Sequence, residues 1–190
     1  MLTSLQFDLP EELNSKMDEI LQYELTTFLK VQLILLVRFL KIIKDRIVDS
    51  NSIPRISENS QVAIWRGDIT QLRIEAIVNA ANQYMLGCFS PNHPCIDNQI
   101  HAQAGPRLRQ ECRRFMKIQN SLEPTGKAKI TKAFNLPSNY ILHTVGPIYN
   151  EVGEREDLLE SCYIECLNLA KNNNIKSIAF CCISTGNCLV

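Results

Sequence analysis

The sequence lacks an excess of either charge: its 190 residues carry 20 Lys and Arg against 20 Asp and Glu. A chain of zero net charge has no global positive field to gather a phosphate backbone or an anionic membrane surface. We therefore expect no nucleic-acid partner. A local anion site made of backbone N–H groups stays open, because such a site needs no net charge.

The chain also lacks an uninterrupted apolar run, and we expect no secretory leader. Its first residues, MLTSLQFDLPEEL, are acidic and have no basic lead before an apolar core. Residues 28–43 are rich in Leu, Ile and Val, but Lys30, Arg38 and Lys41 interrupt them. A membrane span needs about 20 predominantly apolar residues. We expect an amphipathic helix there, no membrane segment, and a cytoplasmic protein.

Eight cysteines are present, and their meaning depends on the compartment. In a small secreted chain they would indicate a disulfide framework. Without a leader we interpret them as free thiols in a reducing compartment. Cys181 and Cys182 are adjacent in an apolar run, where buried thiols are common.

The segment Cys88–Cys95 places two cysteines and His93 within a short stretch interrupted by prolines. Two sulfur ligands and one nitrogen ligand suit Zn²⁺ and leave one tetrahedral position for water or substrate. Packing of the thiols is the alternative interpretation. A closed structural site would need a fourth ligand, and His101 and Cys112 both stay open as candidates.

Asp97 follows the last of these cysteines by two residues. Its ordinary use would be as the N-cap of a helix that begins at Asn98. Its functional use would be as a carboxylate beside a metal site, where it orients or deprotonates a water. The two roles are compatible. Cys95 would then precede the helix N-terminus, a position that favours a thiolate.

The chain divides into a helical extension over residues 1–58 and an α/β domain over residues 59–190. Apolar residues recur at helical spacing to about residue 49, and a polar break follows. The apolar face of these helices needs a cover, which a partner protein would supply if the domain does not. Short apolar strands then alternate with helices, which indicates a layered α/β fold. The predicted strands are 62–66, 76–79, 127–131, 140–145 and 177–182, and the predicted helices are 97–104, 106–115 and 158–172.

Three predicted strands end in loops suited to a ligand, and ligands in open α/β sheets bind at the carboxyl ends of strands. Asn79–Asn82 has two Asn side chains around small residues, Ser184–Gly186 offers hydroxyls and a glycine, and Gly67–Thr70 contains the carboxylate of Asp68. An ordinary turn is the alternative for each loop taken alone. His143, inside a predicted strand, is interpreted as a structural histidine.

Taken in order, six motifs resemble the macrodomain family of ADP-ribose-binding modules. The motifs are Gly67–Thr70, Ile77–Asn82, Ile96–Gly105, Thr125–Thr131, Ile141–Pro147 and Ile183–Gly186. The cysteine-containing loop is similar to the zinc-containing branch of that family, whose members remove mono-ADP-ribose from proteins. The resemblance implies a three-layer α/β/α domain with a mixed sheet and bound Zn²⁺.

The resemblance also implies roles for the residues that meet the ligand. Asp68 would hold the adenine amino group, with the backbone of Ile69 nearby. Asn82 would contact the distal ribose. The diphosphate would lie in a loop that begins with Ser184, Thr185 and Gly186.

At the reacting end, the resemblance places Zn²⁺ on Cys88, His93 and Cys95, beside the distal ribose. Asp97 would be the acid/base or water-positioning carboxylate. Asp97 and Asn82 are thus the predicted catalytic residues. The predicted partner is ADP-ribose carried by a modified protein.

The sequence departs from the family pattern after Gly186, where macrodomains continue through a further strand and helix and this chain reads Asn187–Val190. We therefore expect a macrodomain that is incomplete at its C-terminus, with an open sheet edge and exposed apolar surface. The preferred function is a zinc-dependent hydrolase that removes mono-ADP-ribose from proteins. The alternatives are a non-catalytic ADP-ribose reader and an inactive truncated product.

Overall fold

The computed structural model describes residues 46–90, 93–148 and 156–185. The helices expected before residue 46 lie outside these ranges. The expected helical region extended to residue 49, and there the prediction is wrong. Val48–Asp49 forms strand β1, which pairs in parallel with β2 (Leu72–Arg73). A pairing with residues far along the chain decides the backbone here, and helical spacing of apolar residues does not reveal it.

A four-stranded mixed sheet forms the centre of the molecule, in the order β4-β5-β3-β6. β3 (Ala76–Ala81) pairs in parallel with β5 (Tyr140–Val145) on one side and with β6 (Ile178–Ala179) on the other. β4 (Ala128–Lys132) pairs antiparallel to β5. Four of the predicted strands are therefore confirmed, although the strand expected over 177–182 is paired only at 178–179.

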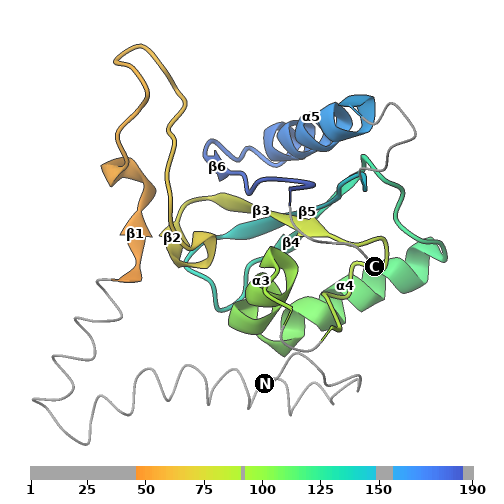
Figure 1. Cartoon of the computed structure of the whole chain (residues 1–190). Helices are drawn as coiled ribbons and strands as arrows, with labels where there is room; N and C mark the ends of the chain where they lie inside the picture. Colours follow the sequence, from red (N-terminus) through yellow and green to blue (C-terminus); the bar gives the residue numbers. More distant parts are fainter. Residues whose placement is uncertain (1–45, 91–92, 149–155, 186–190) are drawn as a thin grey trace, which may run out of the picture.

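Helices cover both faces of this sheet (Figure 1). α3 (Ile96–Ala104) and α4 (Pro106–Gln119) lie on one face, and α5 (Glu156–Asn172) lies on the other. Successive strand residues point to opposite faces. Ile77 therefore packs in the cluster under α3 and α4, whereas Val78 packs in the cluster under α5. The predicted three-layer α/β/α fold with a mixed sheet is confirmed.

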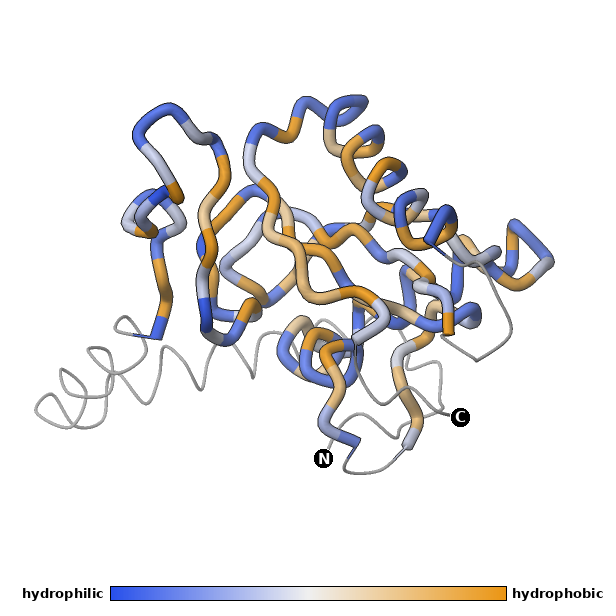
Figure 2. Tube along the Cα trace, turned by 45° about the horizontal axis from the view of Figure 1, so that its top comes forward, coloured by the Kyte–Doolittle hydropathy of each residue, from blue (hydrophilic) through white to orange (hydrophobic). Residues whose placement is uncertain are grey.

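The hydropathy of the chain follows these layers (Figure 2). The central strands are largely apolar, while the helices alternate apolar and polar residues along their length. This pattern places the core between sheet and helices, as the burial of the strand residues requires. Within the described ranges, no helix is long and apolar enough to cross a membrane.

One predicted strand does not form. Residues 62–66 make only an isolated bridge, between Ala63 and Arg55. Val62 is 58% exposed and Ile64 is 80% exposed, so their side chains are not in a core. A run of β-prone residues becomes a strand only when a neighbouring strand pairs with it, and none of the described strands does so along 62–66.

Candidate functional site

The three predicted metal ligands come together just before α3. The donor atoms of Cys88, His93 and Cys95 all lie within 4.8 Å of one another, and the Sγ of Cys88 is 3.5 Å from Nδ1 of His93. Sulfur and nitrogen donors around one tetrahedral Zn²⁺ lie about 3.5–3.8 Å apart, given their usual bond lengths. The donor set and the distance between Cys88 and His93 therefore fit a zinc ion. We call residues Leu86–Cys95 the metal loop.

The start of α3 differs from the sequence prediction in two respects. Cys95 is the N-cap, because its Sγ accepts the Asn98 N–H at 3.4 Å. Asp97 lies in the first turn, so the prediction that it caps the helix is wrong. Burial raises the pKa of Cys95 to about 11, and the neighbouring Cys88 adds to that rise. The expected preference for a thiolate is thus outweighed, and a cation between the two sulfurs would reverse this.

Asp97 and Asn82, the predicted catalytic residues, are close together. Asp97 is only 4% exposed. Its Oδ1 accepts a hydrogen bond from Asn79 at 2.8 Å, and its Oδ2 lies 3.4 Å from the amide nitrogen of Asn82. Asn82 also donates to the carbonyl of Gly87 at 3.0 Å, which ties the carboxylate to the metal loop.

The environment of Asp97 acts on its protonation in two directions. Burial raises the pKa of Asp97 to about 6, because the charged form loses water. The hydrogen bond from Asn79 and the positive charge of Arg109 oppose that rise. The surroundings of Asp97 therefore combine a dry site with groups that favour the carboxylate, a combination typical of functional carboxyl groups.

His143 is a satisfied core histidine, as the sequence predicted. It is fully buried, with Nδ1 3.1 Å from the amide nitrogen of Asn79 and Nε2 2.9 Å from the hydroxyl of Thr131. Since Asn79 donates, Nδ1 must accept, and Nε2–H therefore donates to Thr131. Burial lowers the pKa of His143 to about 3, so the ring is neutral at ordinary pH.

His101 and Cys112, the candidates for a fourth metal ligand, belong to a different group. Their donor atoms cluster with those of His143, beneath α3 and α4. Both nitrogens of His143 already have partners, so we assign no metal to this second group. Burial lowers the pKa of His101 well below its ordinary value. Its 3.5 Å contact with Asp97 is therefore a contact of a neutral ring, not an ion pair.

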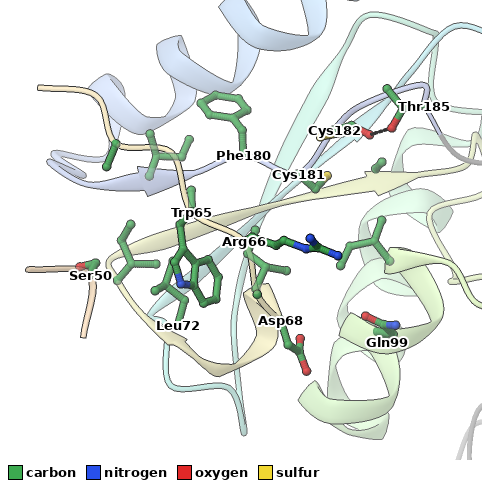
Figure 3. Close-up of a pocket in the computed structure, with 18 of the residues that line it drawn as sticks. Ser50, Trp65, Arg66, Asp68, Leu72, Gln99, Phe180, Cys181, Cys182 and Thr185 are labelled. Carbon is green, nitrogen blue, oxygen red and sulfur yellow. Dashed lines mark hydrogen bonds between the residues drawn. The ribbon is translucent and has the colours of Figure 1, made fainter. Parts of the chain in front are cut away.

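A cleft of about 1620 Å³ opens beside the metal loop (Figure 3). Its walls come from residues 61–69, from the end of β3, from the segment that begins α3, and from the residues around and after β6. The cleft is large enough for a nucleotide-sized ligand. Six predicted site residues line it: Asp68, Ile69, His93, Cys95, Ser184 and Thr185.

Asp68 is held by its own turn. Its Oδ1 accepts hydrogen bonds from the backbone N–H and the hydroxyl of Thr70, at 2.9 and 2.6 Å. It is thereby the N-cap of a short 3-10 helix, η2 (Ile69–Gln71). The carboxylate remains exposed on the cleft wall, while the Ile69 side chain is buried in the core.

The opposite wall is built by the residues after β6. Ser184 has a φ of 62°, and its hydroxyl packs against Gly146, where a Cβ would have no room. Thr185 donates its hydroxyl to the carbonyl of Cys182 at 2.9 Å (Figure 3). Gly186, the third residue predicted for this loop, lies outside the described ranges.

Arg109 and Asn98 hold the metal loop, and neither was predicted from the sequence. Nε of Arg109 donates to the carbonyl of Leu86 at 2.8 Å, and the amide of Asn98 donates to the carbonyl of His93 at 3.0 Å. Arg109 is on an amphipathic helix, where an arginine is usually expected to face solvent. Its position next to the buried Leu108 was the one sequence feature that placed Arg109 near the core, and this feature is weak evidence.

The sequence is similar to one protein family and to several curated proteins. The family described as "Macro domain" matches residues 78–190. A curated protein-ADP-ribose hydrolase of Treponema medium is 58% identical over 130 residues, which cover 67% of this chain and 50% of that protein. One of the same name from Staphylococcus aureus (strain MSSA476) is 48% identical over 132 residues, covering 68% and 50%. The chain spans about half the length of the curated relatives it matches.

Solved structures match the fold at somewhat lower identity. The Trypanosoma brucei macrodomain in complex with ADP-ribose superposes with a TM-score of 0.64 at 41% identity, covering 74% of this chain and 56% of that chain. The Oceanobacillus iheyensis macrodomain with ADP gives a TM-score of 0.58 at 42% identity, covering 63% and 62%.

Proposed function

The chain belongs to the macro domain family, and on that premise we propose that it is a zinc-dependent hydrolase that removes mono-ADP-ribose from modified proteins. The observation that carries the proposal is the meeting of two features next to the cleft. One is the donor set of the metal loop, and the other is the buried carboxylate of Asp97. A carboxylate tied to a three-ligand metal site is an arrangement suited to hydrolysis.

The cleft would hold the ADP-ribose. Asp68, exposed on one wall, would accept the adenine amino group, and Ile69 would lie beside the base. Ser184 and Thr185 on the opposite wall would begin the contacts to the diphosphate. The solved Trypanosoma brucei relative is described in complex with ADP-ribose, which supports this choice of ligand.

The reacting ribose would then lie toward the metal loop. Cys88, His93 and Cys95 would hold the zinc ion. When bound, this ion would act as a Lewis acid that polarises an oxygen of the substrate. Two thiol groups and one imidazole are a donor set that zinc prefers over the harder divalent cations. Asn82 would contact the ribose while its amide also keeps the carbonyl of Gly87 in place.

Asp97 would act as the general base and general acid of the reaction. As the oxygen of a water molecule forms a bond to the anomeric carbon C1″, the carboxylate takes a proton from that water. The bond from C1″ to the protein side chain breaks, its electron pair stays with the side-chain atom, and that atom receives the proton that Asp97 took from the water, which returns Asp97 to its carboxylate form. The products are free ADP-ribose and the unmodified protein. Asn79 orients Asp97 through the 2.8 Å hydrogen bond.

A non-catalytic reader is the second candidate, and one observation favours it. Asp97 is 4% exposed and both of its oxygens face asparagine amides, so the carboxylate is enclosed when no ligand is bound. In a reader the same residues would order the wall of the cleft. The two candidates differ in a single measurable respect, the release of ADP-ribose.

The experiment compares release and binding in the same preparations. The purified chain is assayed for zinc content, for ADP-ribose affinity, and for free ADP-ribose released from an automodified protein. We expect Asp97→Ala to lower release by about 10²–10⁴-fold. Cys95→Ala should lose both zinc and release, and Cys166→Ala, which changes a buried thiol on α5 away from the cleft, should match the wild type. Tight ADP-ribose binding by the wild type without release would establish the reader and contradict the hydrolase.

A further inference from the structure

The metal loop has no regular secondary structure between Leu86 and Cys95 in its described residues, so its shape must come from other elements. Three side chains donate hydrogen bonds to its backbone. Asn82 binds the carbonyl of Gly87, Asn98 binds that of His93, and Arg109 binds that of Leu86. Asn98 and Asn82 are close to the loop in sequence, whereas Arg109 reaches it from α4.

Arg109 contacts the loop on both sides of Cys88. Its Nε donates to the carbonyl of Leu86 at 2.8 Å, and its guanidinium carbon lies 4.9 Å from the centre of the Phe89 ring. A terminal nitrogen of the same guanidinium lies 3.0 Å from the position that a Cβ on Gly87 would occupy. With a φ of 83° at Gly87, the chain turns closely around this side chain.

We propose that Arg109 is a positioning residue for the metal site, which fixes Cys88 opposite His93 and Cys95. This inference rests on the proposed function, because it takes those three residues as the ligands. A thiol on an irregular loop has many orientations, and a metal gains affinity when the correct one is selected in advance. Arg109 selects it by holding the residues before and after Cys88.

The chemistry of arginine suits this position better than that of lysine. The guanidinium carries several donors and a delocalised charge, so it can donate Nε–H to the loop while its central carbon lies over the Phe89 ring. A lysine would retain the charge but would not reproduce both contacts.

The test measures metal affinity without any turnover. Zn²⁺ is titrated into the metal-free chain in competition with a chromophoric chelator, and Co²⁺ is added in parallel to read the thiolate-to-metal absorption. We expect Arg109→Met to weaken Zn²⁺ binding about tenfold or more, as loss of outer-shell partners usually does. Arg109→Lys should fall between Arg109→Met and the wild type. Arg114→Met, an exposed arginine on the same helix, is the matched control and should stay within about twofold of the wild type.

A variant that fails to fold would imitate the expected result, so circular dichroism of each metal-free chain accompanies the titration. Phe89→Leu provides a second route, since the ring is 40% exposed and its loss leaves the core intact. It should weaken Zn²⁺ binding by about threefold, with a smaller Co²⁺ charge-transfer band. If Arg109→Met folds and binds Zn²⁺ as tightly as the wild type, the inference is overturned. If Arg109→Met does not fold, unchanged Zn²⁺ affinity in both Phe89→Leu and Arg109→Lys overturns it instead. A wild type that binds no Zn²⁺ overturns the proposed metal site itself.

Discussion

The two ends of the candidate site are built in different ways. At the metal-loop end, Asp97 is 4% exposed and is held by Asn79 and Asn82, which are 18 and 15 residues away in the sequence. At the cleft end, Asp68 is exposed and is held by Thr70, two residues away. The metal-loop end is thus fixed by tertiary contacts, whereas the cleft end is fixed by its own turn.

The difference has energetic consequences. A buried polar network is costly to break, because any partner left behind keeps an unsatisfied donor or acceptor away from water. An exposed turn can exchange a lost hydrogen bond for one to water. Substitutions at the metal-loop end should therefore lower turnover and stability, and substitutions at the cleft end should mainly lower affinity for the ligand.

The largest effect is expected at Asp97. Asp97→Asn keeps the shape of the side chain but removes the proton acceptor, so the rate constant kcat for ADP-ribose release should fall about 10²–10⁴-fold. KM should stay within about threefold, since the cleft walls are unchanged. Steady-state kinetics on a mono-ADP-ribosylated protein checks both values. A rise in KM with unchanged kcat would mean that Asp97 contributes to binding, as proposed for Asp68, and would contradict the predicted difference between the two residues.

The next effect is on stability, at His143. His143→Leu removes one of the two hydrogen bonds made by the Asn79 amide nitrogen, which keeps its bond to Asp97, and it removes the bond from Nε2 to the buried hydroxyl of Thr131. The free energy of unfolding of the metal-free chain should fall by about 2–3 kcal/mol, measured by urea denaturation. The control is Thr185→Val at the cleft end, which removes an exposed hydroxyl and should cost less than about 0.5 kcal/mol. Equal losses in the two variants would contradict the difference between the ends.

The smallest effect is expected at Asp68. Asp68→Ala removes the proposed acceptor for the adenine amino group, and ADP-ribose affinity should fall about tenfold, as measured by isothermal titration calorimetry. Once substrate is saturating, kcat should equal that of the wild type. ADP-ribose affinity that is unchanged by Asp68→Ala would remove this residue from the binding site.

The contrast between the ends also explains what the sequence was able to predict. The strand Tyr140–Val145 and the helix from Pro106 have clear local signals, an apolar run and a proline after a glycine, and both are confirmed. The candidate metal ligands cluster in a short segment, so their spacing alone was enough to predict them. In each case, the residues that make the structure are neighbours in the chain.

The predictions that failed depended on distant partners. Residues 62–66 have the composition of a strand but no described strand pairs along them, and β1 forms where helical spacing was expected because Leu72–Arg73 lies beside it. Arg109 was missed because its contacts with Leu86 and Phe89 join segments about 20 residues apart, a distance over which periodicity carries no information. Tertiary contacts hold the metal-loop end of the candidate site, and the sequence showed the candidate ligands at that end but not Arg109 and Asn98, which hold them in place.

The central claim is that the metal loop and Asp97 together make this macro domain a hydrolase. Its most direct test is the release of ADP-ribose from a modified protein by the chain before and after zinc is removed with a chelator. The account predicts that the stripped chain still binds ADP-ribose but releases it only at the background rate, and that added Zn²⁺ restores release. Undiminished release by a chain shown to contain no zinc would contradict the claim.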